Sequence, residues 1–158
     1  MSFNKVKEYM KSFGKEKDII ELTESSATVD LAAQALHISP SQIAKTLAFE
    51  LPDAVIVIVM SGDVKIDNHL FKEQFHTKAK MLSKDDTLKY TGHAVGGVCP
   101  FALPSNVKVF LDESLKAFSK VYPACGSSNS AIGLTISELE KMTKPNEWIK
   151  VTKAREEA

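Results

Sequence analysis

Residues 45–60 read KTLAFELPDAVIVIVM, and this stretch decides the fold. Its two halves, Lys45–Leu51 and Ala54–Met60, have the composition of β-strands, and Pro52-Asp53 between them is a turn pair. The second half is almost continuously apolar and β-branched, as a strand covered on both faces would be. The stretch therefore predicts a hairpin inside a sheet.

The sequence around this hairpin predicts short helices before it and mostly strands after it. Helix starts are marked by capping residues at Thr28, Ser39, Ser83 and Thr135, the last with Glu138 three residues further on. Apolar spacing predicts two more helices, one over residues 3–13 and one over residues 67–75. Strands are expected at 18–22, 107–111, 121–124 and 131–134, and a helical turn at 112–118. Residues 148–151 are expected to close the fold, followed by a frayed tail from Lys153.

This order of elements favours a mixed α/β class, in the α+β sense, over a doubly wound parallel sheet. The strands of the second half are not separated by the regular helical crossovers that such a sheet requires. No repeat or long linker divides the chain, and 158 residues is a usual size for one domain. We therefore expect a single domain over residues 1–158, with a mixed, partly closed sheet surrounded by short helices.

Composition and charge exclude several classes of protein. With 44% apolar and 25% charged residues, the chain is neither a disordered tail nor a collagen-like rod. It has no long apolar run and no apolar segment near its start, so we expect neither a membrane span nor a secretory signal. Twenty basic residues balance twenty acidic ones, and Arg155 is the only arginine, which argues against extensive duplex binding. Because Cys99 and Cys125 are the only cysteines, we expect a reduced, cytoplasmic chain.

Three features of the sequence could carry chemistry, and each has a simpler explanation. The glycine-rich loop at 91–104 could present backbone N–H groups to an anion, or could merely turn the chain. The polar run at 126–130 could bind a substrate, or could satisfy its own backbone. Lys45, flanked by apolar residues, could anchor a phosphate or carboxylate, or could extend to solvent at a strand end.

Motifs for several other chemistries are absent. The sequence has no nucleophile elbow, no phosphate-binding loop and no dinucleotide fingerprint. The four histidines are scattered, and neither they nor the cysteines have metal-ligand spacing. We therefore expect no metal and no cofactor.

Four segments together resemble one family. IAKTL at 43–47, GGVCPF at 96–101, LDESL at 111–115 and GSSNSAI at 126–132 occur in this order in the YbaK/EbsC family, which the chain resembles from about Glu24 to Val151. That family includes the editing domain of bacterial prolyl-tRNA synthetases and its free-standing relatives. The resemblance implies a partly closed, β-barrel-like sheet and hydrolysis of the ester that joins a wrong amino acid to tRNA, typically Cys or Ala on tRNA(Pro). No synthetase catalytic core accompanies the motifs, so the resemblance implies a free-standing deacylase that acts in trans.

The resemblance also implies the site residues. The family's lysine falls on Lys45, where it would hold the terminal phosphate or another anionic group. The family's G-x-x-x-P loop supplies the rest of the predicted catalytic set, which is Gly96, Gly97, Val98, Cys99 and Pro100. The predicted substrate-binding set is Thr46, His93, Gly126, Ser127, Ser128 and Asn129. The implied partner is the acceptor end of aminoacyl-tRNA. The low charge of the chain adds the hypothesis that prolyl-tRNA synthetase or an elongation factor supplies further tRNA contacts.

An aminoacyl ester is already activated, so this chemistry needs no strong enzymatic nucleophile. The enzyme must place water, or a thiol of the substrate itself, against the carbonyl and stabilise the oxyanion with backbone N–H groups. Two alternatives stay open. Cys99 could be the nucleophile of a cysteine hydrolase, with His93 near it in sequence. The chain could also be a non-catalytic tRNA- or nucleotide-binding module of the same fold.

Overall fold

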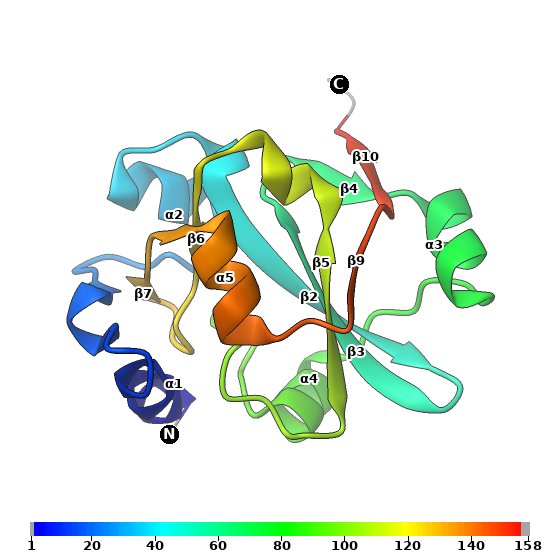
Figure 1. Cartoon of the computed structure of the whole chain (residues 1–158), viewed down its shortest axis with the longest axis horizontal. Coiled ribbons are helices and arrows are strands. Elements are labelled where there is room, and N and C mark those ends of the chain that lie inside the picture. The colour runs from blue at the N-terminus through cyan, green and yellow to red at the C-terminus, as the bar shows by residue number, and fades with distance from the viewer. Residues whose placement is uncertain (1, 156–158) are drawn as a thin grey trace.

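The predicted hairpin forms the centre of a six-stranded sheet (Figure 1). The computed structural model describes residues 2–155. In it, β2 (Ile43–Leu51) and β3 (Ala54–Ser61) pair antiparallel along almost their whole length. The other strands are β5 (Val107–Asp112), parallel to β3; β9 (Glu147–Ile149), parallel to β5; β6 (Lys120–Pro123), parallel to β2; and β8 (Leu134–Thr135), antiparallel to β6. The predicted mixed sheet is confirmed.

Two short antiparallel ribbons and a set of short helices surround this sheet. The ribbons are β1 (Ile20–Glu21) with β7 (Ser130–Ala131), and β4 (Val64–Ile66) with β10 (Thr152–Ala154). The α-helices are α1 (Ser2–Lys11), α2 (Val29–Leu36), α3 (Asn68–Phe75), α4 (Lys84–Thr91) and α5 (Ile136–Thr143). Single 3-10 turns are η1 (Glu16–Asp18), η2 (Pro40–Gln42) and η3 (Glu113–Ala117). Within residues 2–155, no helix combines the length and apolarity needed to cross a bilayer.

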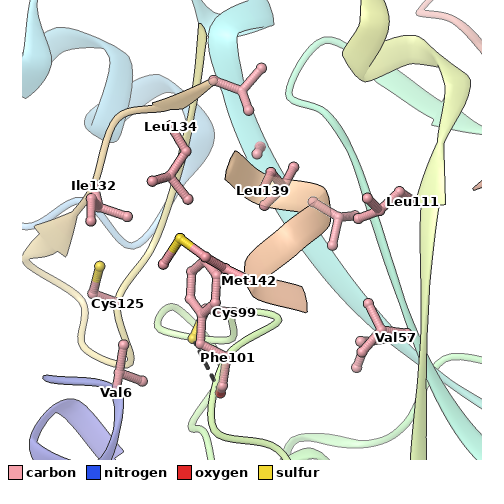
Figure 2. Packing of buried hydrophobic residues seen from close by; sticks show 14 of the residues in the cluster. Val6, Val57, Cys99, Phe101, Leu111, Cys125, Ile132, Leu134, Leu139 and Met142 are labelled. Atoms are coloured by element: carbon pink, nitrogen blue, oxygen red, sulfur yellow. Dashed lines mark hydrogen bonds between the residues drawn. The ribbon is translucent and has the colours of Figure 1, made fainter. Parts of the chain in front are cut away.

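The central strand β3 separates two apolar clusters, because both of its faces are covered. Val57 and Val59 point into the larger cluster, which contains residues of α1 and α5 such as Val6 and Met142 (Figure 2). The alternate residues of β3, Ile56 among them, point into a second cluster with α3. Each fully buried side chain of this size contributes about 1.5–3 kcal/mol. The apolar run at residues 54–60 therefore fixes β3 in the interior.

The C-terminal part differs from the prediction. Residues 153 and 154 belong to β10 rather than to a frayed tail, and residues 156–158 lie outside the described residues. The buried carboxylate of Asp112 accepts hydrogen bonds from the N–H of Val151 (2.9 Å) and the hydroxyl of Thr152 (2.7 Å). These bonds hold the segment against the sheet, where β10 pairs with β4, a strand that was not predicted. Such long-range pairing leaves no local signal in sequence.

Two other predicted strands are shorter or divided. The strand expected at 18–22 covers only Ile20–Glu21, since Asp18 ends η1. The strand expected at 131–134 is two separate strands, β7 and β8, which pair with β1 and β6 respectively. The chain changes partner between them, around Gly133.

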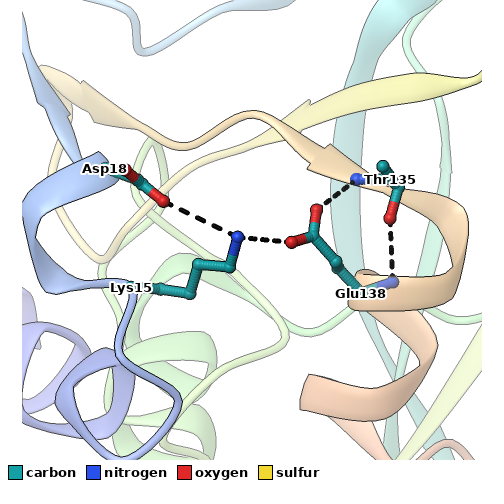
Figure 3. Close-up of polar contacts among 4 residues, drawn as sticks. All are labelled: Lys15, Asp18, Thr135 and Glu138. Carbon is teal, nitrogen blue, oxygen red and sulfur yellow. Dashed lines mark hydrogen bonds and ion pairs between the residues drawn. The ribbon is translucent and has the colours of Figure 1, made fainter.

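A polar cluster joins α5 to the segment after α1. Lys15 Nζ lies 3.6 Å from Asp18 Oδ2 and also bonds Glu138 (Figure 3). Glu138 accepts the N–H of Thr135 (2.9 Å), and Thr135 Oγ1 accepts the N–H of Glu138 (3.1 Å), which is the predicted capping box. The Lys15 hydrogen bond, helped by the Thr135 N–H, lowers the pKa of the Glu138 carboxyl.

We expect Glu138→Gln to reduce the pH dependence of stability. A lowered pKa in the folded state stabilises the fold above the unfolded value of about 4.3, and this stabilisation is lost as pH falls further. The urea midpoint of the variant should therefore lie below that of the wild type near neutral pH, and the gap should narrow in acid. Glu8→Gln is the control, because among residues 2–155 Glu8 pairs only with exposed Lys11. A gap for Glu138→Gln that stays constant with pH would contradict this assignment.

Candidate functional site

A cavity lies where one edge of β2 has no neighbouring strand. On this edge β2 pairs with β6 only at Ile43 and Ala44. The next partner is the segment at 80–82, where Ala48 O accepts the N–H of Leu82 (3.1 Å). A cavity of about 260 Å³ occupies the gap. It is lined by Ser26, Ala27, Thr28, Val29, Ala32, Ile43, Ala44, Lys45, Thr46, Leu47, Ala48, Met81, Leu82, Thr87, Val95, Gly96, Val98, Tyr122, Ala124, Ser130 and Ala131.

Thr46 offers this cavity its unpaired polar groups. Ala48 and Glu50 form their hydrogen bonds on the edge away from β3, and the direction alternates along a strand, so the N–H and C=O of Thr46 point to that same edge. The Thr46 side chain is buried, and within the described residues its Oγ1 has no hydrogen-bond partner. Leaving a buried hydroxyl unpaired costs about 1–3 kcal/mol. Thr46 therefore carries a cost to stability at the wall of the cavity.

The glycine-rich loop lies against the cavity, and the polar loop lies behind it. Gly96 and Val98 line the cavity, and Gly96 has a φ of +99°, which favours glycine. A Cβ at Gly97 would approach the N of Ser127 to 2.8 Å, so only glycine lets the two loops touch. Among residues 2–155, no hydrogen-bond acceptor meets the N–H of Gly96 or of Val98. These N–H groups can bind an anion or an oxyanion.

Lys45 contributes to the cavity wall, but its ammonium is bound elsewhere. The side chain lies on the face of β2 shared with Leu47, opposite to Thr46. Its Nζ donates to the carbonyls of Val64 (2.5 Å) and Gly62 (3.3 Å). Burial, and secondarily the charge of Arg155, lowers the pKa of Lys45. These bonds use two of the three N–H donors of the ammonium, and the third has no partner among the described residues.

Cys99 and His93 are brought together, but both are sealed in the core. His93 Nε2 lies 2.8 Å from the carbonyl of Phe101, to which it donates, and His93 Nδ1 therefore accepts from Ser2. Cys99 Sγ lies 3.6 Å from the same Nε2, which has no lone pair left to accept the thiol proton. The thiol instead donates to the carbonyl oxygen of Phe101, and Figure 2 draws this bond. Burial raises the pKa of Cys99 to about 12 and lowers the pKa of His93. A nucleophilic thiolate needs the opposite environment.

The polar loop mostly satisfies itself. Ser127 Oγ bonds Asn129 Oδ1 (3.0 Å) and Ser130 Oγ (2.6 Å), and Asn129 Nδ2 donates to Leu22 O (3.1 Å). Ser128 and Asn129 are exposed, and Gly126 packs against Ser2. None of the four predicted residues Gly126, Ser127, Ser128 and Asn129 lines the cavity; Ser130 and Ala131, the next residues along, do so.

Of the predicted site residues, Lys45, Thr46, Gly96 and Val98 line the cavity. Pro100 instead borders a separate groove beside α1. Sequence reasoning missed the start of α2 (residues 26–29), Met81, Val95 and Tyr122. Thr28 was predicted as a helix cap, but no local pattern in the sequence predicts that α2 or Tyr122 lies beside β2. Within the described part of the chain, no three His, Cys, Asp or Glu side chains cluster as metal ligands would.

Comparison with known proteins matches the cavity-forming part of the chain to one family. The family model of the aminoacyl-tRNA editing domain matches residues 23–142, a span that includes every residue lining the cavity. The uncharacterized protein YwhH of Bacillus subtilis (strain 168) is 47% identical over 154 residues, covering 97% of this chain and 98% of YwhH. A proline–tRNA ligase of Streptococcus suis (strain 05ZYH33) is 29% identical over 107 residues, which is 64% of this chain but only 17% of the ligase.

A solved structure has the same fold. The crystal structure of a candidate trans-editing enzyme for prolyl tRNA synthetase superposes with a TM-score of 0.86 at 24% identity, covering 97% of this chain and 98% of that protein. At this level of identity the likeness establishes the fold alone.

The buried thiols generate a prediction. We expect Cys99 and Cys125 to react with a thiol reagent such as DTNB only as fast as the protein unfolds, because both are buried and burial raises both pKa values. The measurement is the labelling rate in native buffer and in urea. Rapid labelling of Cys99 in the native protein would restore the cysteine-hydrolase hypothesis.

Proposed function

The chain belongs to the aminoacyl-tRNA editing domain family, and from this premise we propose that it is an aminoacyl-tRNA deacylase that acts in trans on mischarged tRNA. The observation that carries the proposal is the open edge of β2. Among the described residues, the backbone N–H and C=O of Thr46 and its hydroxyl have no partners at this cavity, and the loop that also lines the cavity has unpaired N–H groups.

The proposed reaction is hydrolysis of the ester between the amino acid and the terminal ribose. Water adds to the carbonyl carbon, and the carbon–oxygen bond to the ribose then breaks. The ribose oxygen takes a proton, which leaves a free amino acid and a tRNA with a free terminal hydroxyl. The negative charge that develops on the carbonyl oxygen would be stabilised by the N–H groups of Gly96 and Val98.

Thr46 would hold the substrate and the attacking water. The α-ammonium of the aminoacyl group is a donor and the ester carbonyl an acceptor, so the group can bond the strand edge as another strand would. In this arrangement the Thr46 C=O accepts from the α-ammonium, and Thr46 Oγ1 orients the water. Lys45 then acts as a positioning residue, since its bonds to Gly62 and Val64 tie β2 to the turn after β3.

The lining of the cavity favours a small, neutral amino acid. Its walls are mostly Ala, Val, Ile and Leu side chains, and the volume is about 260 Å³. A charged side chain there would be desolvated without a partner. We propose Ala or Cys as the amino acid removed and tRNA(Pro) as the carrier, which agrees with the similarity to a segment of proline–tRNA ligases. With Cys, the substrate's own thiol could replace water as the nucleophile.

Action in trans is supported by the extent of a relative's chain. YwhH consists almost entirely of the matched region, since 98% of it aligns with this chain. The chain has no net charge, so its own phosphate contacts would contribute little to tRNA affinity. We propose that a partner such as prolyl-tRNA synthetase or an elongation factor supplies the remaining contacts.

We expect release of labelled amino acid from one of Ala-, Cys-, Ser- or Thr-tRNA(Pro), with Pro-tRNA(Pro) spared. Lys45→Ala should lose most of this release, because β2 loses its tie to the turn. Circular dichroism of the variant controls for loss of fold. No release from any member of the panel would contradict the proposal and leave the non-catalytic binding module, which has no turnover to lose.

Thr46→Val tests the role of the hydroxyl. Valine has the shape of threonine without its unpaired polar atom, so the free energy of unfolding should stay equal or rise by about 1 kcal/mol. The kcat for deacylation should fall about ten-fold, because the water loses one hydrogen bond. Thr87→Val is the control, since the Thr87 hydroxyl lies beside the cavity but already donates to Ser83 O (2.7 Å). A Thr46→Val variant with unchanged kcat would remove the hydroxyl from the mechanism.

A further inference from the structure

The ribbon of β4 and β10 places two lysines directly opposite one another. In its antiparallel register Lys153 is the partner of Lys65, and residues in such a pair point to the same face. The hydroxyl of Thr152 turns inward to bond Asp112 (2.7 Å), so the alternate residue Lys153 faces outward. Lys65 and Lys153 are both exposed. The outer face of the ribbon therefore carries two adjacent ammonium side chains.

This arrangement of like charges is unfavourable in the free protein. Like charges directly opposite one another destabilise a pair of strands. Lys11, Lys80 and Lys116 each meet a carboxylate, whereas within residues 2–155 neither Lys65 nor Lys153 forms an ion pair. An anion bound over the ribbon would relieve the repulsion between the two lysines.

The two carboxylates that flank β4 are engaged in other bonds. Asp67 Oδ1 accepts the N–H groups of His69 (3.0 Å) and Leu70 (3.1 Å), and so caps α3. Asp63 Oδ1 accepts the hydroxyl of Ser61 (3.2 Å). Neither carboxylate forms an ion pair with a lysine of the ribbon in the described part of the chain.

Arg155 extends the same row of cations. Its N–H donates to the carbonyl of Asp63 (3.4 Å), which continues the register of the ribbon by one residue. Arg155 is exposed, and because it follows Lys153 by two residues it lies on the same outer face. A guanidinium can bind a phosphate through two parallel N–H bonds. The single arginine of the sequence is thus placed in line with the lysine pair.

The ribbon adjoins the cavity through Lys45. Lys45 lines the cavity, and its Nζ donates to the carbonyl of Val64 (2.5 Å), the first residue of β4. Burial, and after it the charge of Arg155, lowers the pKa of Lys45, so the two cations lie near each other. The length of one lysine side chain therefore separates the cavity wall from the ribbon, and a polymer whose end occupies the cavity can reach the ribbon.

We propose that the outer face of this ribbon, with Lys65, Lys153 and Arg155, binds the sugar–phosphate backbone of the single-stranded RNA end that leads into the cavity. The proposal rests on the proposed function, since an amino acid esterified to the terminal ribose brings a single strand with it. The phosphates bound are those that precede the terminal nucleotide, so this contact is separate from the terminal phosphate that the family resemblance implies for Lys45.

Two properties of the chain agree with this surface. Two or three phosphate contacts are few beside the roughly 6–10 that give a protein strong salt-dependent binding, which fits a chain without net charge. Residues 152–155 also lie beyond residues 23–142, the part that the family model matches. The ribbon therefore adds a binding surface that the matched region alone does not contain.

The salt dependence of deacylation tests the ribbon. Each phosphate contact on a single strand contributes about 0.7 to the slope of log(kcat/KM) against log salt, so the double variant Lys65→Gln/Lys153→Gln should be shallower by about 1.4. KM should rise more than kcat falls. With an aminoacyl-adenosine that carries no phosphate, the difference between the wild type and this double variant should disappear.

Lys141→Gln/Lys144→Gln is the matched control. Both lysines are exposed and form no ion pair among residues 2–155, and they lie at the C-terminal end of α5, away from the ribbon (Figure 1). The change in net charge is the same. Equal slopes for the two double variants would overturn the ribbon as a binding surface while leaving the deacylase intact. Since removal of a like-charge pair should not lower the urea midpoint, loss of fold is separated from loss of binding.

If the wild type releases no amino acid, the proposed function fails and the ribbon is judged by binding. A short fluorescent RNA ending in CCA, without an amino acid, should then bind Lys65→Gln/Lys153→Gln more weakly than Lys141→Gln/Lys144→Gln. Equal anisotropy curves for the two double variants would overturn the ribbon as well.

Discussion

The gap beside β2 is the feature on which the rest of the site depends. Between Ala44 and Ala48 this strand loses β6 and has not yet met the segment at 80–82, so within the described residues the N–H and C=O of Thr46 have no strand partner. Backbone groups buried without partners are rare because each costs free energy. The fold retains this one next to an unpaired hydroxyl, in a cavity of about 260 Å³. A substrate that offers a donor and an acceptor can satisfy what the sheet leaves open.

Packing on the other side of β2 and β3 offsets the free-energy cost of this gap. The strand β3 is buried in two apolar clusters, and Lys45 ties β2 to the turn after β3 through two carbonyls. Asp112 then fastens the C-terminal segment to the same side of the sheet. The edge at Thr46 is thus held rigid by contacts that lie away from the cavity. Preorganised groups of this kind stabilise developing charge without rearranging during the reaction.

The sequence predicted what depends on local chemistry. The hairpin, the caps at Thr28, Ser83 and Thr135, and the mixed sheet all follow from short patterns, and the structure confirms them. It also led to two loops that do touch, through Gly97 and Ser127. The sequence did not predict which groups several of these side chains contact. Nothing in the residues around Lys45 says that its ammonium donates to the carbonyls of Gly62 and Val64, and nothing around Cys99 says that the thiol is buried in the core. Tyr122 and β10 reach their places through pairings with distant segments, for which a single sequence holds no signal.

The central claim is that an ester-linked amino acid bonds the open edge of β2 at Thr46. The most direct measurement is amide hydrogen exchange at Thr46 by NMR, with and without a non-hydrolysable amide analogue of alanyl-adenosine. The account predicts that exchange at the Thr46 N–H slows when the analogue binds, together with that at Gly96 and Val98. Binding of the analogue with unchanged exchange at Thr46 would contradict it.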